Sequence, residues 1–122
     1  TKESTHFHAE GMSSAAFRHG PLEMAGPRTA VAIFAGLEPA RTLNHRLSED
    51  ISRQGARALW IDDAVGSGAL RLPLASSSDS IRALYRPILE ILPAQLMTLA
   101  LAQLRDHPAG QFSRATKVTA SE

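Results

Sequence analysis

The first two dozen residues of the chain contain most of the side chains that could do chemistry. Two histidines and a carboxylate alternate in His6-x-His8-x-Glu10, Glu3 lies just before them, and His19 follows. Imidazoles and carboxylates are the side chains that most often transfer protons in enzymes. General acid–base chemistry is therefore the first possibility that this segment suggests.

The same residues could in principle bind a metal, because imidazole and carboxylate are good zinc ligands. The spacing of His6, His8 and Glu10 brings them to one face only in an extended segment, whereas the residues that follow favour a helix. The chain has no cysteine, which excludes disulfides and thiolate ligands. We therefore expect ordinary histidines here, with no metal site and no cofactor.

Two more candidates stand outside that cluster. His19 is followed by Gly20-Pro21, which fixes the backbone, and a histidine at a rigid turn can serve as a general acid or base. Lys117 lies in the polar tail near the other end of the chain. Taken one at a time, each also fits a structural role: His19 could end a helix, and Glu3 and Lys117 could simply face solvent.

The composition is that of a soluble globular domain with one core. Of 122 residues, 43% are hydrophobic and 20% are charged. The net charge of +1 gives no electrostatic reason to expect nucleic acid or an anionic membrane as a partner. No uninterrupted apolar run reaches the roughly 18–20 residues of a membrane span, and we expect a cytoplasmic protein.

Strand and helix patterns follow the reactive segment. The apolar run at 29–35 predicts a strand buried on both faces, which is typical of parallel sheets. A helix is expected next, with Leu43, Leu47 and Ile51 facing the core and Gly55 ending it.

Two further strands are predicted at 58–61 and 70–74, the second at a sheet edge because it contains Pro73. A helix is then expected over 81–104. Its two prolines, Pro87 and Pro93, should kink or split it, since each removes a backbone donor. Its wide apolar stripe predicts burial on more than one side.

The order strand, helix, strand, strand, helix predicts an α/β layered domain with a parallel sheet. Three strands are few for such a sheet. The chain also begins Thr1-Lys2-Glu3 without an initiator methionine. We therefore expect a fragment whose first strand is missing.

Several motifs, kept in order along essentially the whole chain, resemble the SIS (sugar isomerase) domain family. The most similar members are the second SIS domain of glucosamine-6-phosphate synthases, the glucosamine-6-phosphate deaminases and related phosphosugar isomerases. The resemblance rests on Lys2-Glu3, His8-Ala9-Glu10, Phe17-Arg18-His19-Gly20-Pro21, Leu92-Pro93-x-Gln95-Leu96 and Lys117-Val118-Thr119.

The resemblance implies a role for four residues. Glu3 matches the base that moves a proton between C1 and C2 of an open-chain sugar, which needs one carboxylate over two adjacent carbons. His19 matches a histidine that assists ring opening and reaches the site of the neighbouring subunit. Lys117 matches a lysine that contacts the carbonyl end and can form a Schiff base. Thr116 matches a neighbouring position whose backbone touches the ligand.

The resemblance also implies a fold and partners. Residues 1–122 would form one three-layer α-β-α SIS domain, with a parallel sheet flanked by helices and an incomplete N-terminal end. The substrate would be a sugar phosphate such as fructose 6-phosphate or glucosamine 6-phosphate. The protein would be a homodimer with shared active sites, with no direct nucleic-acid partner and no membrane.

Two features depart from the family pattern. Ala16 stands where members usually have a glutamate or similar residue, and the loop that holds the sugar phosphate lies in the preceding SIS domain of family members. The first hypothesis is an isomerase, deaminase or aminotransferase domain, and Glu3, His19 and Lys117 together favour it. The alternatives are a sugar-phosphate-binding regulatory module without catalysis and a domain retained only as a dimer interface.

Overall fold

The computed structural model describes residues 1–62, 70–73 and 79–111. The chain divides into two compact units, one formed by Met12–Pro93 and the other by Thr1–Gly11 together with Ala94–Glu122. Helix α4 (Asp79–Leu104) contributes residues to both units. Each unit has its own contacts and is described by itself.

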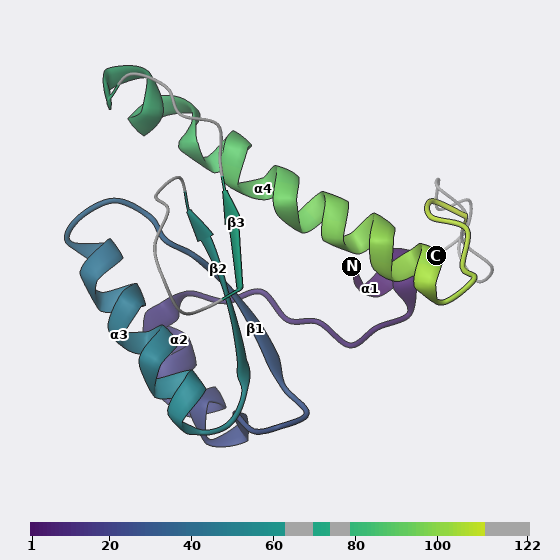
Figure 1. The fold of residues 1–122 in the computed structure, drawn as a ribbon, viewed down its shortest axis with the longest axis horizontal. Coiled ribbons are helices and arrows are strands. Elements are labelled where there is room, and N and C mark those ends of the chain that lie inside the picture. Colours follow the sequence, from purple (N-terminus) through teal and green to yellow (C-terminus); the bar gives the residue numbers. More distant parts are fainter. Residues whose placement is uncertain (63–69, 74–78, 112–122) are drawn as a thin grey trace, which may run out of the picture. The chain divides into compact units, whose positions relative to one another are not determined.

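The Met12–Pro93 unit contains a parallel sheet with strand order β1-β2-β3 (Figure 1). The strands are β1 (Ala30–Phe34), β2 (Arg57–Asp62) and β3 (Leu70–Pro73). Because β2 pairs with both neighbours, β3 lies at an edge of the described sheet and Pro73 ends it, as the sequence predicted. The α/β fold with a parallel sheet is confirmed.

Helix α3 (Ala40–Arg53) connects β1 to β2 and packs against both strands. Leu47 and Ile51 lie in the core, as predicted, and Gly55 follows the helix end with φ of 81°. The buried residues that form this core are Ile33, Ala35, Leu47, Ile51, Ala56 and Trp60.

The prediction that Leu43 faces the core is wrong, because its side chain is 56% exposed. Asn44 takes the inward position in the first turns of α3 instead. Its amide donates hydrogen bonds to the carbonyl oxygens of Phe34 and Ala35, at 3.2 and 3.1 Å. The helix therefore begins against the polar end of β1, where a carbonyl partner is needed and a leucine would leave it unpaired.

Two short helical pieces precede the sheet. Helix α2 (Ser14–Arg18) is capped by the Ser13 hydroxyl, which accepts a hydrogen bond from the Ala16 N–H. The 3₁₀ helix η1 (Pro21–Met24) follows directly. The turn at His19-Gly20-Pro21 was predicted from the sequence, whereas the 3₁₀ helix that follows it was not.

Helix α4 runs as one helical element through both of its prolines, so the expected split at Pro87 or Pro93 is absent. A proline removes its own N–H, but the residues around it still bond along the helix. The expected burial on several sides is also wrong for the side chains that the structure describes. Many large apolar residues of α4 are exposed, namely Leu84, Tyr85, Ile88, Ile91, Leu92, Leu96, Leu99 and Leu104.

The stretch Leu84–Leu104 is also long and apolar enough to cross a bilayer, with a mean hydropathy of 1.4. The sequence prediction of no membrane-length apolar stretch needs that correction. Length and composition alone are weak evidence for a membrane span, because the core helix of a soluble protein meets the same criterion.

In the other unit, helix α1 (Lys2–Thr5) lies beside the C-terminal part of α4 (Figure 1). The hydroxyl oxygens of Thr1 and Thr98 are 2.8 Å apart. The rings of His6 and His107 make a second contact, with centroids 4.2 Å apart. Thr5 is buried, and its hydroxyl donates to the Thr1 carbonyl at 2.8 Å. The segment that carries Glu3 is thus fixed to α4 at two points.

Candidate functional site

Glu3 lies in the first turn of α1 with its side chain exposed. Within the described part of the chain, its carboxylate has no hydrogen bond and no ion pair. A carboxylate that is not engaged by a neighbouring cation is available to accept a proton from a substrate.

Glu10 is engaged, in contrast, by the ammonium group of Lys2, which lies 2.5 Å from its Oε1 atom. The hydrogen bond from Lys2, with the Lys2 charge and a smaller effect of His8, lowers the pKa of Glu10 below its ordinary value of 4.5. Glu10 is therefore held as an anion, and its charge neutralises Lys2. Of these two glutamates, Glu3 is the one suited to act as a base.

The side chains of the His6-x-His8-x-Glu10 segment make separate contacts. The His6 ring contacts His107, while the His8 Nε2 atom lies 3.9 Å from Glu10. No group of three histidine, aspartate or glutamate side chains among the described residues could hold a metal ion.

His19 lies at the C-terminal end of α2, where its N–H donates to the Ala16 carbonyl at 3.2 Å. The next residue, Gly20, has φ of 152° and ψ of −60°, a backbone conformation that residues other than glycine rarely adopt. Pro21 then begins η1 with its φ already fixed. The backbone on the C-terminal side of His19 is therefore set by residue type as well as by packing.

The turn that carries His19 is anchored on both sides. Phe17 before it and Leu22 after it pack against the core. Arg18 donates to Asp50 of α3 at 2.7 Å, and this hydrogen bond is the main reason that the pKa of Asp50 is lowered. The His19 ring itself is exposed and makes no side-chain hydrogen bond to the described residues. A fixed backbone with an open imidazole suits a group that must reach a substrate.

The other two predicted site residues, Lys117 and Thr116, lie outside the described residues. Glu3 and His19 belong to different units, so the structure does not define the distance between them. A single site formed by these four residues thus stays a prediction. The structure describes only the local surroundings of Glu3 and His19.

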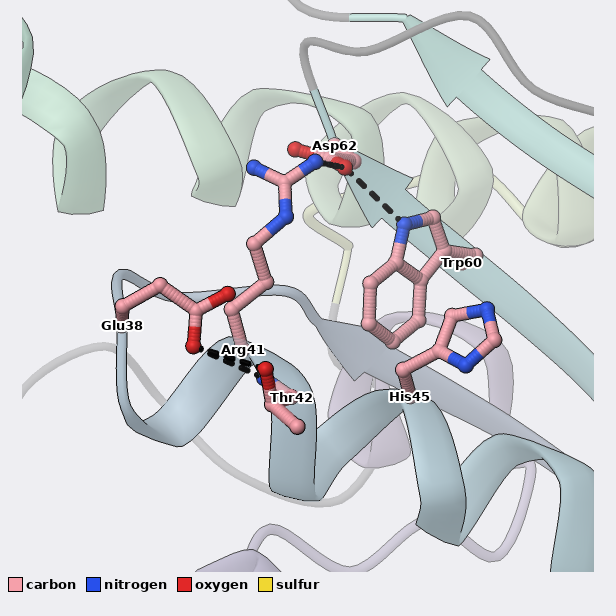
Figure 2. Close-up of a pocket in the computed structure, with 6 residues that line it drawn as sticks. All are labelled: Glu38, Arg41, Thr42, His45, Trp60 and Asp62. Carbon is pink, nitrogen blue, oxygen red and sulfur yellow. Dashed lines mark hydrogen bonds and ion pairs between the residues drawn. The ribbon is translucent and has the colours of Figure 1, made fainter.

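A second polar feature was not predicted from the sequence. A pocket of about 180 Å³ lies where β2 ends beside the first turns of α3 (Figure 2). The Glu38 carboxylate accepts from the Thr42 N–H and hydroxyl, at 3.3 and 2.8 Å. The pocket is lined by Glu38, Arg41, Thr42, His45, Trp60 and Asp62.

Asp62 is the centre of this feature. Its Oδ2 atom accepts from Arg41 at 2.5 Å and from the Trp60 indole N–H at 3.1 Å, as Figure 2 shows. Its Oδ1 atom accepts from Arg86 of α4 at 3.0 Å. The sequence signal was an aspartate at the end of a buried strand, but nothing in the sequence indicated its partners.

The network continues from Arg86 to Glu90, with a Nε–Oε1 distance of 2.5 Å. Glu90 also accepts a long hydrogen bond, at 3.4 Å, from the N–H of Gly36 after β1. Two arginines thus face two carboxylates, and each carboxylate has donors from more than one group. Such mutual pairing is typical of a structural connection rather than of a reactive site.

Comparisons with known proteins agree with the fold. No family model matches the chain. The glutamine–fructose-6-phosphate aminotransferase (isomerizing) of Tropheryma whipplei strain TW08/27 is 30% identical over 112 residues. That of Leifsonia xyli subsp. xyli strain CTCB07 is 27% identical over 115 residues. Each match covers 83% of this chain and 17% of the relative, so the chain spans about a sixth of their length.

Among solved structures, the C-terminal domain of glucosamine-fructose-6-phosphate aminotransferase from Francisella tularensis matches with a TM-score of 0.74 and 19% identity. That match covers 90% of this chain and 31% of the solved chain. The chain is therefore an α/β protein with the fold of an SIS domain. The proteins that it resembles in sequence are the glutamine–fructose-6-phosphate aminotransferases, in their C-terminal isomerase part, which confirms the predicted resemblance.

Proposed function

We propose that the chain is the C-terminal SIS part of a cytoplasmic enzyme that acts on an open-chain sugar phosphate. The enzyme isomerises this sugar phosphate or transfers an amino group to it. The observation that carries the proposal is that the Glu3 carboxylate has no partner among the described residues, whereas Glu10 is engaged by Lys2. The similarity to aminotransferases that are named for fructose 6-phosphate supports the choice of substrate class.

In this proposal, Glu3 removes a proton from one of the two adjacent carbons C1 and C2 and returns it to the other. The electron pair of the broken C–H bond is held in an enediolate, and a second proton moves from the hydroxyl oxygen to the carbonyl oxygen, so that the carbonyl group passes from one carbon to the other with no net oxidation or reduction. Because α1 is fixed to α4 through Thr1 and His6, the carboxylate starts from a defined position.

His19 assists the opening of the sugar ring by moving a proton to or from the ring oxygen. Its exposure on a rigid turn agrees with a role in which it reaches the active site of the neighbouring subunit. A homodimer with shared sites is part of the proposal.

Lys117 contacts the carbonyl end of the sugar, where it forms an iminium or stabilises the developing negative charge. Thr116 supplies a backbone contact beside it. The part of the protein that binds the phosphate group is not among the described residues. Fructose 6-phosphate and glucosamine 6-phosphate are the substrates that we propose to test.

The proposal is tested by Glu3→Gln in the complete protein, with Glu10→Gln as a matched control. Exchange of the C1/C2 hydrogens with solvent is followed by NMR in deuterium oxide, and sugar-phosphate binding is measured by calorimetry. Glu3→Gln should lower exchange by at least about a hundredfold with binding retained, since general base catalysis contributes typically 10²–10⁴-fold. Glu10→Gln should retain exchange within tenfold.

Exchange within tenfold of wild type in Glu3→Gln would remove Glu3 from this role. Binding of fructose 6-phosphate without exchange in the wild-type protein would instead support a regulatory module. Borohydride trapping tests Lys117 separately, because only an iminium is reduced to a stable adduct, and Lys117→Met should abolish it.

A further inference from the structure

Two histidines that no proposed step uses lie ring to ring in the Thr1–Gly11 and Ala94–Glu122 unit. The ring centroids of His6 and His107 are 4.2 Å apart, and the planes are tilted by 46°. The Nε2 atom of His107 is buried and has no hydrogen-bond partner among the residues that the structure describes. Buried polar atoms are usually paired, so this contact needs an explanation.

The backbone conformation at each helix end fixes the points at which the two rings are attached. His6 follows the last turn of α1 in the left-handed conformation, with φ of 49°. His107 follows Asp106, whose φ is 50°, and its N–H donates to the Ala102 carbonyl at 2.9 Å. The Asp106 N–H donates to the Gln103 carbonyl, which completes the pattern that ends many helices. The ring contact therefore joins the ends of two helices.

Protonation changes this contact. When both rings are neutral, the pair is an ordinary aromatic contact. When only the exposed His6 carries a proton, the pair is a cation–π contact. With a proton on both rings, two like charges lie about 4 Å apart and a charged N–H of His107 is buried without an acceptor. The doubly protonated pair is therefore the unfavourable state.

The other charged residues of this unit that the structure describes do not compensate for that state. Lys2 and Glu10 pair with each other, and His8 lies beside Glu10. The remaining charged residues of the two elements are Glu3, Arg105 and Asp106, and none forms an ion pair with either ring.

We propose that His6 and His107 form a proton-sensitive latch, which holds α1 on the end of α4 at neutral pH and releases it in acid. The catalytic consequence rests on the proposed function, because α1 carries Glu3. At neutral pH the latch keeps Glu3 in place. In acid, protonation of both rings separates them, and Glu3 loses its position.

The latch is tested by NMR on the complete chain, through the nuclear Overhauser effect between the His6 and His107 rings. The signal should be present at pH 7.5 and lost at pH 5.0. The double variant His6→Phe/His107→Phe keeps two rings but cannot be protonated, so its ring-to-ring signal should persist at both pH values. His8→Phe removes an exposed histidine that touches no ring, and it should behave as the wild type.

The ring signal does not depend on activity, which separates the latch from the proposed function. Persistence of the wild-type signal at pH 5.0, or its absence at pH 7.5, overturns the latch. In the complete enzyme, turnover of wild type relative to the double variant should fall at least fivefold between pH 7.5 and 5.5. If the ratio of wild-type to double-variant turnover stays constant while the ring signal is lost, the link between the latch and Glu3 is overturned. If no variant shows turnover, only the proposed function is overturned.

Discussion

The ammonium of Lys2 lies 2.5 Å from the Glu10 carboxylate, although the two residues are eight positions apart and the chain between them is mostly not helical. This pair closes the N-terminal segment into a loop in which Glu10 is engaged, whereas Glu3 has no partner in the part of the chain that the structure describes. The two glutamates therefore differ in their partners, which is the difference that a base and a structural carboxylate should show.

Lys2→Met should return the pKa of Glu10 towards its ordinary value of 4.5, because the Lys2 hydrogen bond and charge are the main causes of its lowering. The lowered pKa favours the folded state at pH values above 4.5. That contribution is lost as the pH falls through the lowered value. A carboxyl titration by NMR measures the change, and Lys2→Arg, which keeps the charge, is the control.

Equal Glu10 titrations in wild type and Lys2→Met would show that the pair does not persist in solution. Both side chains are about half exposed, so the pair should also weaken as the salt concentration rises.

Asp50→Asn should loosen the turn that carries His19, because Asp50 accepts from Arg18 across two helices and from Arg53 within α3. The pKa of Asp50 is lowered chiefly by the Arg18 hydrogen bond, so the stabilisation is present above its ordinary value of 3.8. It is lost as the pH falls through the lowered value.

The drop in melting temperature caused by Asp50→Asn should therefore be seen at pH 7 and should shrink at the most acidic pH that the fold tolerates. Arg53→Met is the matched control, since it removes only the pair within the helix. A drop of the same size for Arg53→Met and Arg18→Met would contradict the anchoring role of Arg18.

The sequence predicted those features that depend on neighbouring residues. The strand at 29–35 was recognisable from its apolar run, and the turn after His19 from Gly20-Pro21. The predicted burial of that strand on both faces is wrong, because only Ile33 of β1 is buried and Phe34 is 38% exposed. Leu43 was misplaced because a four-residue repeat does not show which side chain must satisfy the carbonyls of an adjacent strand. In the structure, that task falls to Asn44.

The contacts that could not be predicted join residues far apart in the sequence. Asp62 and Arg86 meet only because α4 crosses the end of β2, and His6 meets His107 only because α1 lies on the end of α4. Residue types suggested charge and aromatic character at these positions. The pairing itself depends on the tertiary fold, which no local pattern encodes.

Glu90→Leu should destabilise the chain by about 3–5 kcal/mol, because Arg86 is buried and would lose one of the carboxylates that pair with it. The double variant Arg86→Met/Glu90→Leu should cost less than the sum of the two single changes, since it leaves neither charge of that pair buried. Urea denaturation measures both. Arg41→Met is the control, and its cost should be smaller because the Arg41 side chain is 32% exposed. Additive costs for the double variant would show that the two side chains do not interact.

Gly20→Ala should destabilise the fold by about 1–3 kcal/mol, because an alanine rarely adopts φ of 152° with ψ of −60°. The cost is conformational and not steric, since nothing lies within 4 Å of a Cβ built at this position. Gly11 is the matched control: it has equal space and no positive φ. Gly11→Ala should stabilise the chain by up to about 1 kcal/mol through the unfolded state. Urea denaturation should therefore show a lower free energy of unfolding for Gly20→Ala and a higher one for Gly11→Ala.

In the complete enzyme, Gly20→Ala should also lower turnover at least tenfold at temperatures where it remains folded, because the relaxed turn moves His19. A stable Gly20→Ala variant with full turnover would show that the conformation of Gly20 does not position His19.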